Sequence, residues 1–198
     1  MTTIVSFLSF PSISWWQQAI AASELVLDGC EHYEKMTMRN RYRIAGSNNP
    51  ILLSVPLTSG RNQRTAMRDV EIYNRDRWQV QHWRTLVSVY RRTPFFEHYE
   101  PSLQSLFEKE YARLTDFNRD SMLWVMKQLR LNIPVAEANA YIADYGSTCT
   151  DLRQWQPGPQ WQAKRYYQVF EDRIGFQPDM SILDLLFSEG PATLNFLR

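Results

Sequence analysis

Titratable side chains are concentrated just after the second apolar stretch of the chain, in the run Asp-Gly-Cys-Glu-His-Tyr-Glu-Lys over residues 28–35. A loop that follows a buried strand is a common place for a binding or catalytic site. A carboxylate near a histidine raises the pKa of the imidazole and fixes its tautomer, as general acid–base catalysis requires. Asp28 and His32 are therefore candidate catalytic residues, although a solvated charged loop would give the same run.

A row of cations follows this loop. If residues 35–44 are extended, the two-residue period of a strand places Lys35, Thr37, Arg39, Arg41 and Arg43 on one face. Alternate residues of a strand stand about 6.5–7 Å apart, and guanidinium groups grip carboxylate and phosphate groups well. Lys35, Arg39 and Arg41 are accordingly predicted to bind an anionic substrate. The outer, solvated face of a β-hairpin is the alternative explanation.

A second histidine lies on a predicted helix. Trp78, His82, Leu86 and Val89 recur at spacings of three and four, which predicts an amphipathic helix over 76–91 with His82 on its apolar side. His82 is a candidate proton-transfer residue, with Arg84 beside it as an anion ligand. A histidine on an apolar helix face is more often a hydrogen-bonded core residue.

The start of the chain predicts a strand–helix–strand unit with parallel strands over 4–10 and 24–28. Ser14 and Gln17 fit a capping box at the start of the intervening helix. Ligands of such units bind at the carboxyl edge of the sheet, beside a helix N-terminus that favours anions. Ser12 and Ser14 are therefore predicted to share a rim with Asp28 and to support the charge of the substrate.

The remaining elements predict an α/β fold in a single domain spanning 1–198: an N-terminal mixed sheet, made of the strand–helix–strand unit and a hairpin, followed by a mainly helical C-terminal half. The expected hairpin pairs 35–44 with 51–57. A polar loop over 59–66, a strand over 70–73 and a strand over 133–138 are also predicted. Another helix is predicted to begin after Thr93, which serves as its N-cap. Further helices are predicted over 101–113, 116–130, 166–173 and 181–188, and the longest loop over 146–161.

Several kinds of site lack their sequence signals. The three histidines and two cysteines show no zinc-ligand spacing, so no metal is predicted. No glycine-rich phosphate loop or Gly-x-Ser-x-Gly elbow occurs, and no cofactor is predicted. Cys30 and His32 form a conceivable nucleophile–base pair, but a small buried thiol is the more common role of such a cysteine.

The net charge of +1 conceals an uneven distribution, with −4 over 1–34, +9 over 35–92 and −4 over 93–198. The acidic last segment argues against nucleic-acid binding. The first 34 residues hold no Lys or Arg, and no apolar run approaches the roughly 18 residues of a membrane span. We therefore expect a cytoplasmic protein without a membrane span.

Aromatic residues suggest an alternative to catalysis. The chain holds 7 Trp, 10 Tyr and 10 Phe, and Trp and Tyr anchor many protein interfaces. Trp155 and Trp161 flank a Pro-Gly-Pro loop and are the candidates for exposure. A binding or scaffold protein, with a protein partner or a second copy on this aromatic surface, is the competing hypothesis.

The sequence resembles the WbqC-like protein family, and looks most like its branch from Bacteroidetes-type bacteria. The matching stretches run from Phe-Pro-Ser-Ile-Ser-Trp-Trp at 10–16 through 25–44, Leu-Leu-Ser-Val-Pro at 52–56, Gln-His-Trp-Arg at 81–84 and Tyr90 to 181–191. The family motif falls on Asp28, His32, Lys35, Asn40 and Arg41, and so adds Asn40 to the predicted substrate-binding residues. The family's usual pair of adjacent aspartates is broken by Gly29, and its Gln-Pro-x-x-Leu-Pro opening is altered.

The resemblance implies a cytoplasmic protein of bacterial surface-polysaccharide metabolism that handles activated sugars or acyl groups. Combined with the cationic row, it suggests a transferase-type enzyme that acts on an anionic small molecule; the alternative is a non-catalytic binding or scaffold protein in a polysaccharide-assembly complex.

Overall fold

Four short parallel strands form a sheet in the computed structural model, which describes residues 1–58 and 64–198; most of the polar loop predicted over 59–66 lies outside them. The strands run in the order β5-β2-β1-β6. They comprise β1 (Thr2–Val5), β2 (Glu24–Leu27), β5 (Val135–Glu137) and β6 (Thr150–Asp151). The predicted parallel pairing of the first two strands is confirmed, and the strand expected over 133–138 does return to the sheet. β6 was not predicted, because its two residues lie within the loop expected over 146–161.

The first strand is shorter than predicted, since the backbone leaves the sheet after Val5. Helix α1 (Ile13–Ala19) then connects β1 to β2. Its N-cap is Ser12, whose hydroxyl accepts from the amide of Trp15. The predicted capping box is therefore wrong: Ser14 lies inside the helix, and Gln17 donates to the carbonyl of Phe196.

The predicted hairpin is confirmed as the antiparallel pair β3 (Arg41–Ile44) and β4 (Ile51–Ser54), which forms a sheet of its own. The strand does not extend back to residue 35, however. Met36 adopts a left-handed conformation with φ of 62°, and a 3-10 helix, η1 (Met38–Asn40), precedes β3. This turn points Arg39 into the interior, so the expected row of four cations is reduced to Arg41 and Arg43.

Helices dominate the second half of the chain, as predicted. The longest are α2 (Trp78–Tyr90), α3 (Phe96–Glu108) and α4 (Leu114–Gln128); α5 (Glu171–Ile174), α6 (Ile182–Glu189) and α7 (Thr193–Leu197) follow, with 3-10 turns η2 (Met67–Asp69), η3 (Asn74–Asp76), η4 (Gly146–Thr148) and η5 (Gly190–Ala192). Pro101 lies inside α3 instead of starting a helix, and Phe95 replaces Thr93 as its cap. The helix expected over 166–173 is reduced to α5. Among the helices of the described residues, none combines the length and the apolar composition of a membrane span.

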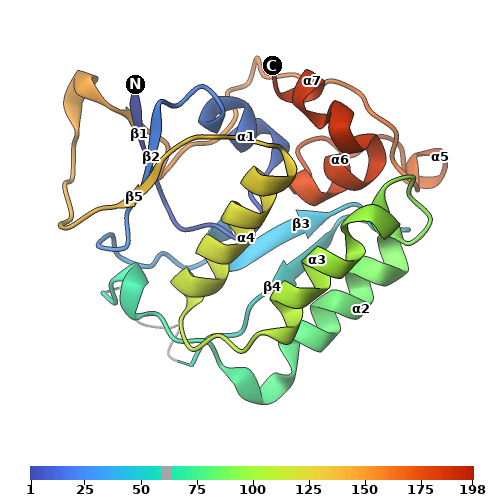
Figure 1. Cartoon of the computed structure of the whole chain (residues 1–198), viewed down its shortest axis with the longest axis horizontal. Helices are drawn as coiled ribbons and strands as arrows, with labels where there is room; N and C mark the ends of the chain where they lie inside the picture. Colours follow the sequence, from blue (N-terminus) through green and yellow to red (C-terminus); the bar gives the residue numbers. More distant parts are fainter. Residues whose placement is uncertain (59–63) are drawn as a thin grey trace.

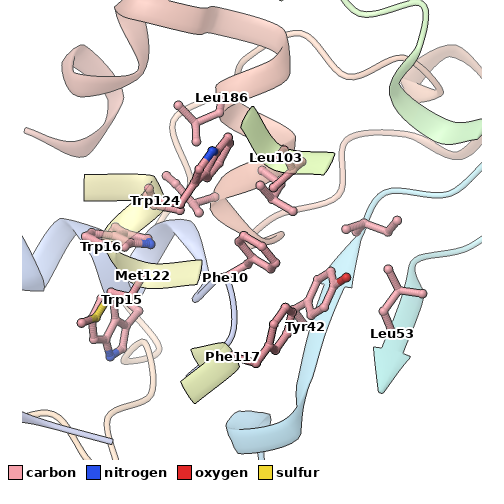
Figure 2. Close-up of a cluster of buried hydrophobic side chains, with 14 of the residues drawn as sticks. Phe10, Trp15, Trp16, Tyr42, Leu53, Leu103, Phe117, Met122, Trp124 and Leu186 are labelled. Carbon is pink, nitrogen blue, oxygen red and sulfur yellow. The ribbon is translucent and has the colours of Figure 1, made fainter. Parts of the chain in front are cut away.

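Phe10 is the centre of the core, and Figure 2 shows its ring between the hairpin and the helices. The residue is fully buried and adopts a φ of 42°. Its ring centroid lies 5.2 Å from that of Tyr42 on β3, 6.0 Å from Phe117 on α4 and 6.2 Å from Phe107 on α3. The turn after β1 is thereby fixed against three separate elements. In Figure 1, α4 lies between the parallel sheet and the α2–α3 pair.

His82, which the sequence offered as a candidate proton-transfer residue, lies in this core. Its position fits the alternative, a hydrogen-bonded core residue. Its Nδ1 is 3.0 Å from the hydroxyl of Tyr42, and its Nε2 is 3.2 Å from the carbonyl oxygen of Ser54. A carbonyl only accepts, so Nε2 carries the proton and Nδ1 accepts from the phenol. Burial lowers the pKa of His82 to about 4. Both ring nitrogens are used to hold the hairpin against α2.

The pKa of His82 predicts a loss of stability in mild acid. Between pH 6.5 and 4 the unfolded chain binds a proton on this histidine and the folded chain does not, so lowering the pH favours unfolding. From pH 7.5 to 5 this group alone lowers the free energy of unfolding by about 2 kcal/mol. His82→Gln removes this component, which urea denaturation at the two pH values measures. His98→Gln, on the exposed face of α3, leaves it in place; an unchanged pH dependence in His82→Gln contradicts the assignment.

Candidate functional site

A cavity of about 170 Å³ opens at the carboxyl end of β1 and β6. Its walls come from the loop after β1 (8–12), the segment after β6 (152–157), and residues 37–43 of η1 and β3. β1 lies between β2 and β6 in the sheet: the chain continues from β1 to β2, its neighbour on one side, whereas β6 is its neighbour on the other. A crevice between two such strands is the usual ligand-binding position of an open parallel sheet.

Two cations line this cavity without an acidic partner. Within the described residues, neither Arg41 nor Arg43 lies within ion-pair distance of a carboxylate. The Nε atom of Arg41 is buried and has no hydrogen-bond partner there. Its two terminal nitrogens lie 3.7 Å from the sulfur of Met36, which is only a weak acceptor. The β3 wall of the cavity therefore has two cations without an ion-pair partner in the described part of the chain and spare donors, while the carboxylate of Asp179, which accepts from the amide of Ser14, also lines the cavity.

Arg39 also lines the cavity, but its charge is neutralised. Its Nε and Nη2 donate to the carboxylate of Glu31 at 3.1 and 2.7 Å, and its Nη1 donates to Glu34 at 3.1 Å. Both Arg39 and Glu31 are buried. Burial raises the pKa of Glu31, and the ion pair with Arg39 opposes this rise. Arg39 thus fixes the loop that follows β2 instead of offering a free cation.

Asp28 is buried beneath a second ion pair. Its carboxylate has 0% exposure and accepts from Arg153 at 2.9 Å and from the amides of Cys30 and Glu31. Arg153 also binds Asp151. Burial alone would raise the pKa of Asp151, but the hydrogen bonds and the charge of Arg153 outweigh this effect and lower the pKa below its ordinary value. Asp28 does not line either cavity. It acts on the site by positioning Arg153 and the segment after β6.

The start of α1 is not available to a ligand in the way the sequence suggested. The amide of Ile13 donates to the carbonyl of Met180, that of Ser14 to Asp179, and that of Trp15 to Ser12. Ser12 lines the cavity, whereas Ser14 is fully buried with its hydroxyl 3.1 Å from that of Ser12. Asp179 already supplies the negative charge at this helix end.

His32 lies in a second cavity of about 440 Å³, which shares Arg153 and Gln154 with the first. Its imidazole is exposed and stacks on Tyr141, with ring centroids 6.3 Å apart and an interplanar angle of 22°. The carboxylates of Glu34 and Asp151 line the same cavity. His32 is therefore an accessible imidazole next to the cationic cavity.

The other predicted site residues lie outside both cavities. His82 is in the core; Asn40 is buried, donating to the carbonyl of Val55 and accepting from Tyr33. Arg84 is exposed on α2, and Lys35 lies in the turn before η1; neither lines a cavity. In the described residues, no group of three His, Cys, Asp or Glu side chains is arranged to hold a metal ion.

Sequence reasoning missed the segment after β6. Trp155 was expected on an exposed aromatic surface, but it is half-buried and lines the first cavity. Trp161 is also half-buried, with its indole N–H donating to Gln17 at 2.8 Å. The expectation of two exposed tryptophans is therefore wrong. The alternation Thr-Asp-Leu-Arg over 150–153 was the available signal, but a two-residue strand is too short to recognise by period.

The Asp28–Arg153 pair predicts a large loss of stability when its cation is removed. Arg153→Met leaves a fully buried carboxylate without its counter-charge and lowers the free energy of unfolding by about 3–5 kcal/mol. Asp28→Asn combined with Arg153→Met costs less than the sum of the two single changes. Urea denaturation of the four proteins measures this coupling. Arg68→Met in the exposed pair with Asp69 changes stability by less than about 1 kcal/mol; additive effects of the first pair contradict the prediction.

Comparison with known proteins gives one match. No curated protein and no solved structure matches the chain significantly. A family model matches residues 8–156, which include the loop after β1, both cationic residues of β3 and most of the segment after β6. The match covers most of the sequence and nearly every wall of the first cavity, and on this basis the chain belongs to the WbqC-like protein family.

Proposed function

We propose that this protein is a transferase-type enzyme that binds an anionic small molecule, an activated sugar or an acyl donor, in the cavity between β1 and β6. The observation that carries the proposal is the pair Arg41 and Arg43, which line this cavity without an acidic partner in the described residues. The cytoplasm and bacterial surface-polysaccharide metabolism, which the resemblance implies, are the proposed setting.

The charge of the cavity favours an oxyanion. Two guanidinium groups one strand period apart repel each other when nothing is bound, and a phosphate or carboxylate removes this repulsion. The other arginines at the site, Arg39 and Arg153, are held by buried carboxylates and form a rigid frame. The site is thereby preorganised, which limits the ordering that a ligand must impose.

The second cavity supports the transfer step. An acceptor hydroxyl or amine held beside Arg153 would attack the electrophilic carbon of the donor, and the bond from that carbon to the anionic leaving group would break. The proton of the acceptor would pass to the imidazole of His32, which lines this cavity. Arg41 and Arg43 would stabilise the charge that develops on the leaving group.

Loss of one cavity cation tests the binding step. Arg41→Gln and Arg43→Gln each weaken binding of nucleotide sugars or acyl phosphates about 10- to 100-fold, since a charge-assisted hydrogen bond is lost. Isothermal titration calorimetry measures the change. Arg92→Gln removes an exposed arginine that does not line the cavity and leaves affinity unchanged. If neither class of ligand binds, or if both cavity variants bind as the original chain does, the proposal is wrong.

His32 is tested separately. His32→Gln is expected to lower the turnover of a ligand that binds by about 10²- to 10⁴-fold, the usual contribution of a general base. The affinity for that ligand is unchanged, because His32 does not line the first cavity. Stopped assays of product formation, with calorimetry on the same protein, separate the two effects. His82→Gln retains turnover at pH 7.5; equal turnover in His32→Gln and the original chain removes His32 from the reaction.

A further inference from the structure

The first cavity has an aromatic wall in addition to its cationic wall. Trp15 is 3% exposed and lines the cavity, and its indole N–H is buried without a hydrogen-bond partner among the described residues. Trp155 and Pro157 also line the cavity, and both come from the segment after β6. Flat apolar side chains of this kind stack on rings and leave their N–H groups for acceptors.

The buried polar atoms at this cavity that lack a hydrogen-bond partner within the described residues are donors, whereas the Asp179 carboxylate, which also lines it, already accepts from the amide of Ser14. Arg41 has a buried, unpartnered Nε, and the indole N–H of Trp15 is unpartnered in the same way across the described residues. The hydroxyls of Ser9, Ser12 and Ser181, by contrast, already bond to Asn118, Ser14 and the carbonyl of Phe10. A ligand rich in acceptors satisfies the first group without disturbing the second.

The volume of the cavity exceeds that of a bare anion. Space of about 170 Å³ holds on the order of ten water-sized groups. The five non-hydrogen atoms of a phosphate fill about half of it. The remaining space takes part of a group attached to the anion, and because Trp15 and Trp155 line the same cavity, that group meets an aromatic surface where it extends toward the opening.

From these three observations we infer that the ligand of this cavity is a phosphorylated ring, a hexose phosphate unit, with its phosphate on Arg41 and Arg43 and its ring against Trp155. The inference rests on the proposed function and narrows it: of the two donor classes, it selects activated sugars over acyl donors. Trp155 becomes the residue that determines this specificity. The anchoring of its segment by Arg153 to Asp28 holds the indole in position.

Calorimetry with inorganic phosphate, glucose 1-phosphate, acetyl phosphate and glucose tests the inference. Glucose 1-phosphate is expected to bind about tenfold more tightly than phosphate or acetyl phosphate, and glucose alone only weakly. Trp155→Leu abolishes this tenfold advantage and leaves phosphate binding unchanged, whereas Trp155→Phe, which keeps a ring, retains most of it. Trp161→Leu is the matched control, because Trp161 is a half-buried tryptophan of the same loop region but does not line the cavity.

The outcomes separate the two proposals. If inorganic phosphate and glucose 1-phosphate both fail to bind, the anion site itself is wrong. If phosphate binds but acetyl phosphate equals glucose 1-phosphate, or Trp155→Leu weakens phosphate and glucose 1-phosphate equally, the anion site stands and the ring inference is overturned. If uridine monophosphate binds more tightly than glucose 1-phosphate, the ring that stacks on Trp155 is a nucleotide base, and the hexose assignment is overturned.

Discussion

The turn at Phe10 constrains the rest of the structure. The chain must leave β1, pass through a left-handed residue and bury a phenylalanine ring among aromatic side chains of β3, α3 and α4. Asn118 of α4 completes the constraint, because its side-chain amide donates to the carbonyls of Phe7 and Arg39 at 2.9 and 2.8 Å. Unpaired, these buried carbonyls would cost stability. One turn therefore joins the parallel sheet to the hairpin and forms a wall of the cavity.

The distribution of charge around the cavity follows from burial. Arg39 and Arg153 have almost no exposed side chain, and each is paired with a buried carboxylate, since an isolated buried charge is costly. Arg41 and Arg43 stand on the open face of β3 and have no such partner among the described residues. The cost of burying an unpaired charge thus separates two structural arginines from two that can bind a ligand. The sequence around the four arginines does not distinguish them, because all lie in polar or arginine-rich stretches.

Much of the fold was predictable from local patterns. The parallel pair β1 and β2, the hairpin, and helices α2, α4 and α6 follow from the period of apolar residues, and α6 also has a capping serine, Ser181. Two of the errors reflect tertiary contacts that override local propensity. Residues 35–40 alternate like a strand, but the pull of Glu31 and Glu34 on Arg39 favours a turn. β6 is held in the sheet by its neighbour, not by its own two residues.

For the candidate site, the sequence by itself determined the chemistry available: a cationic block after residue 34, a charged loop after β2, and a fold whose carboxyl edge is the place to look. Only the tertiary structure decided which members of these groups face a ligand. His82 and Asp28 became structural because burial consumed their polar atoms, and Arg41 remained because no carboxylate of the described chain reaches it. Trp155 entered the site because strand pairing brings the segment after β6 beside β1. The period of apolar residues predicts which face of a strand or helix a side chain takes. Ion pairs between residues more than a hundred positions apart, such as Asp28 and Arg153, form only in the folded chain.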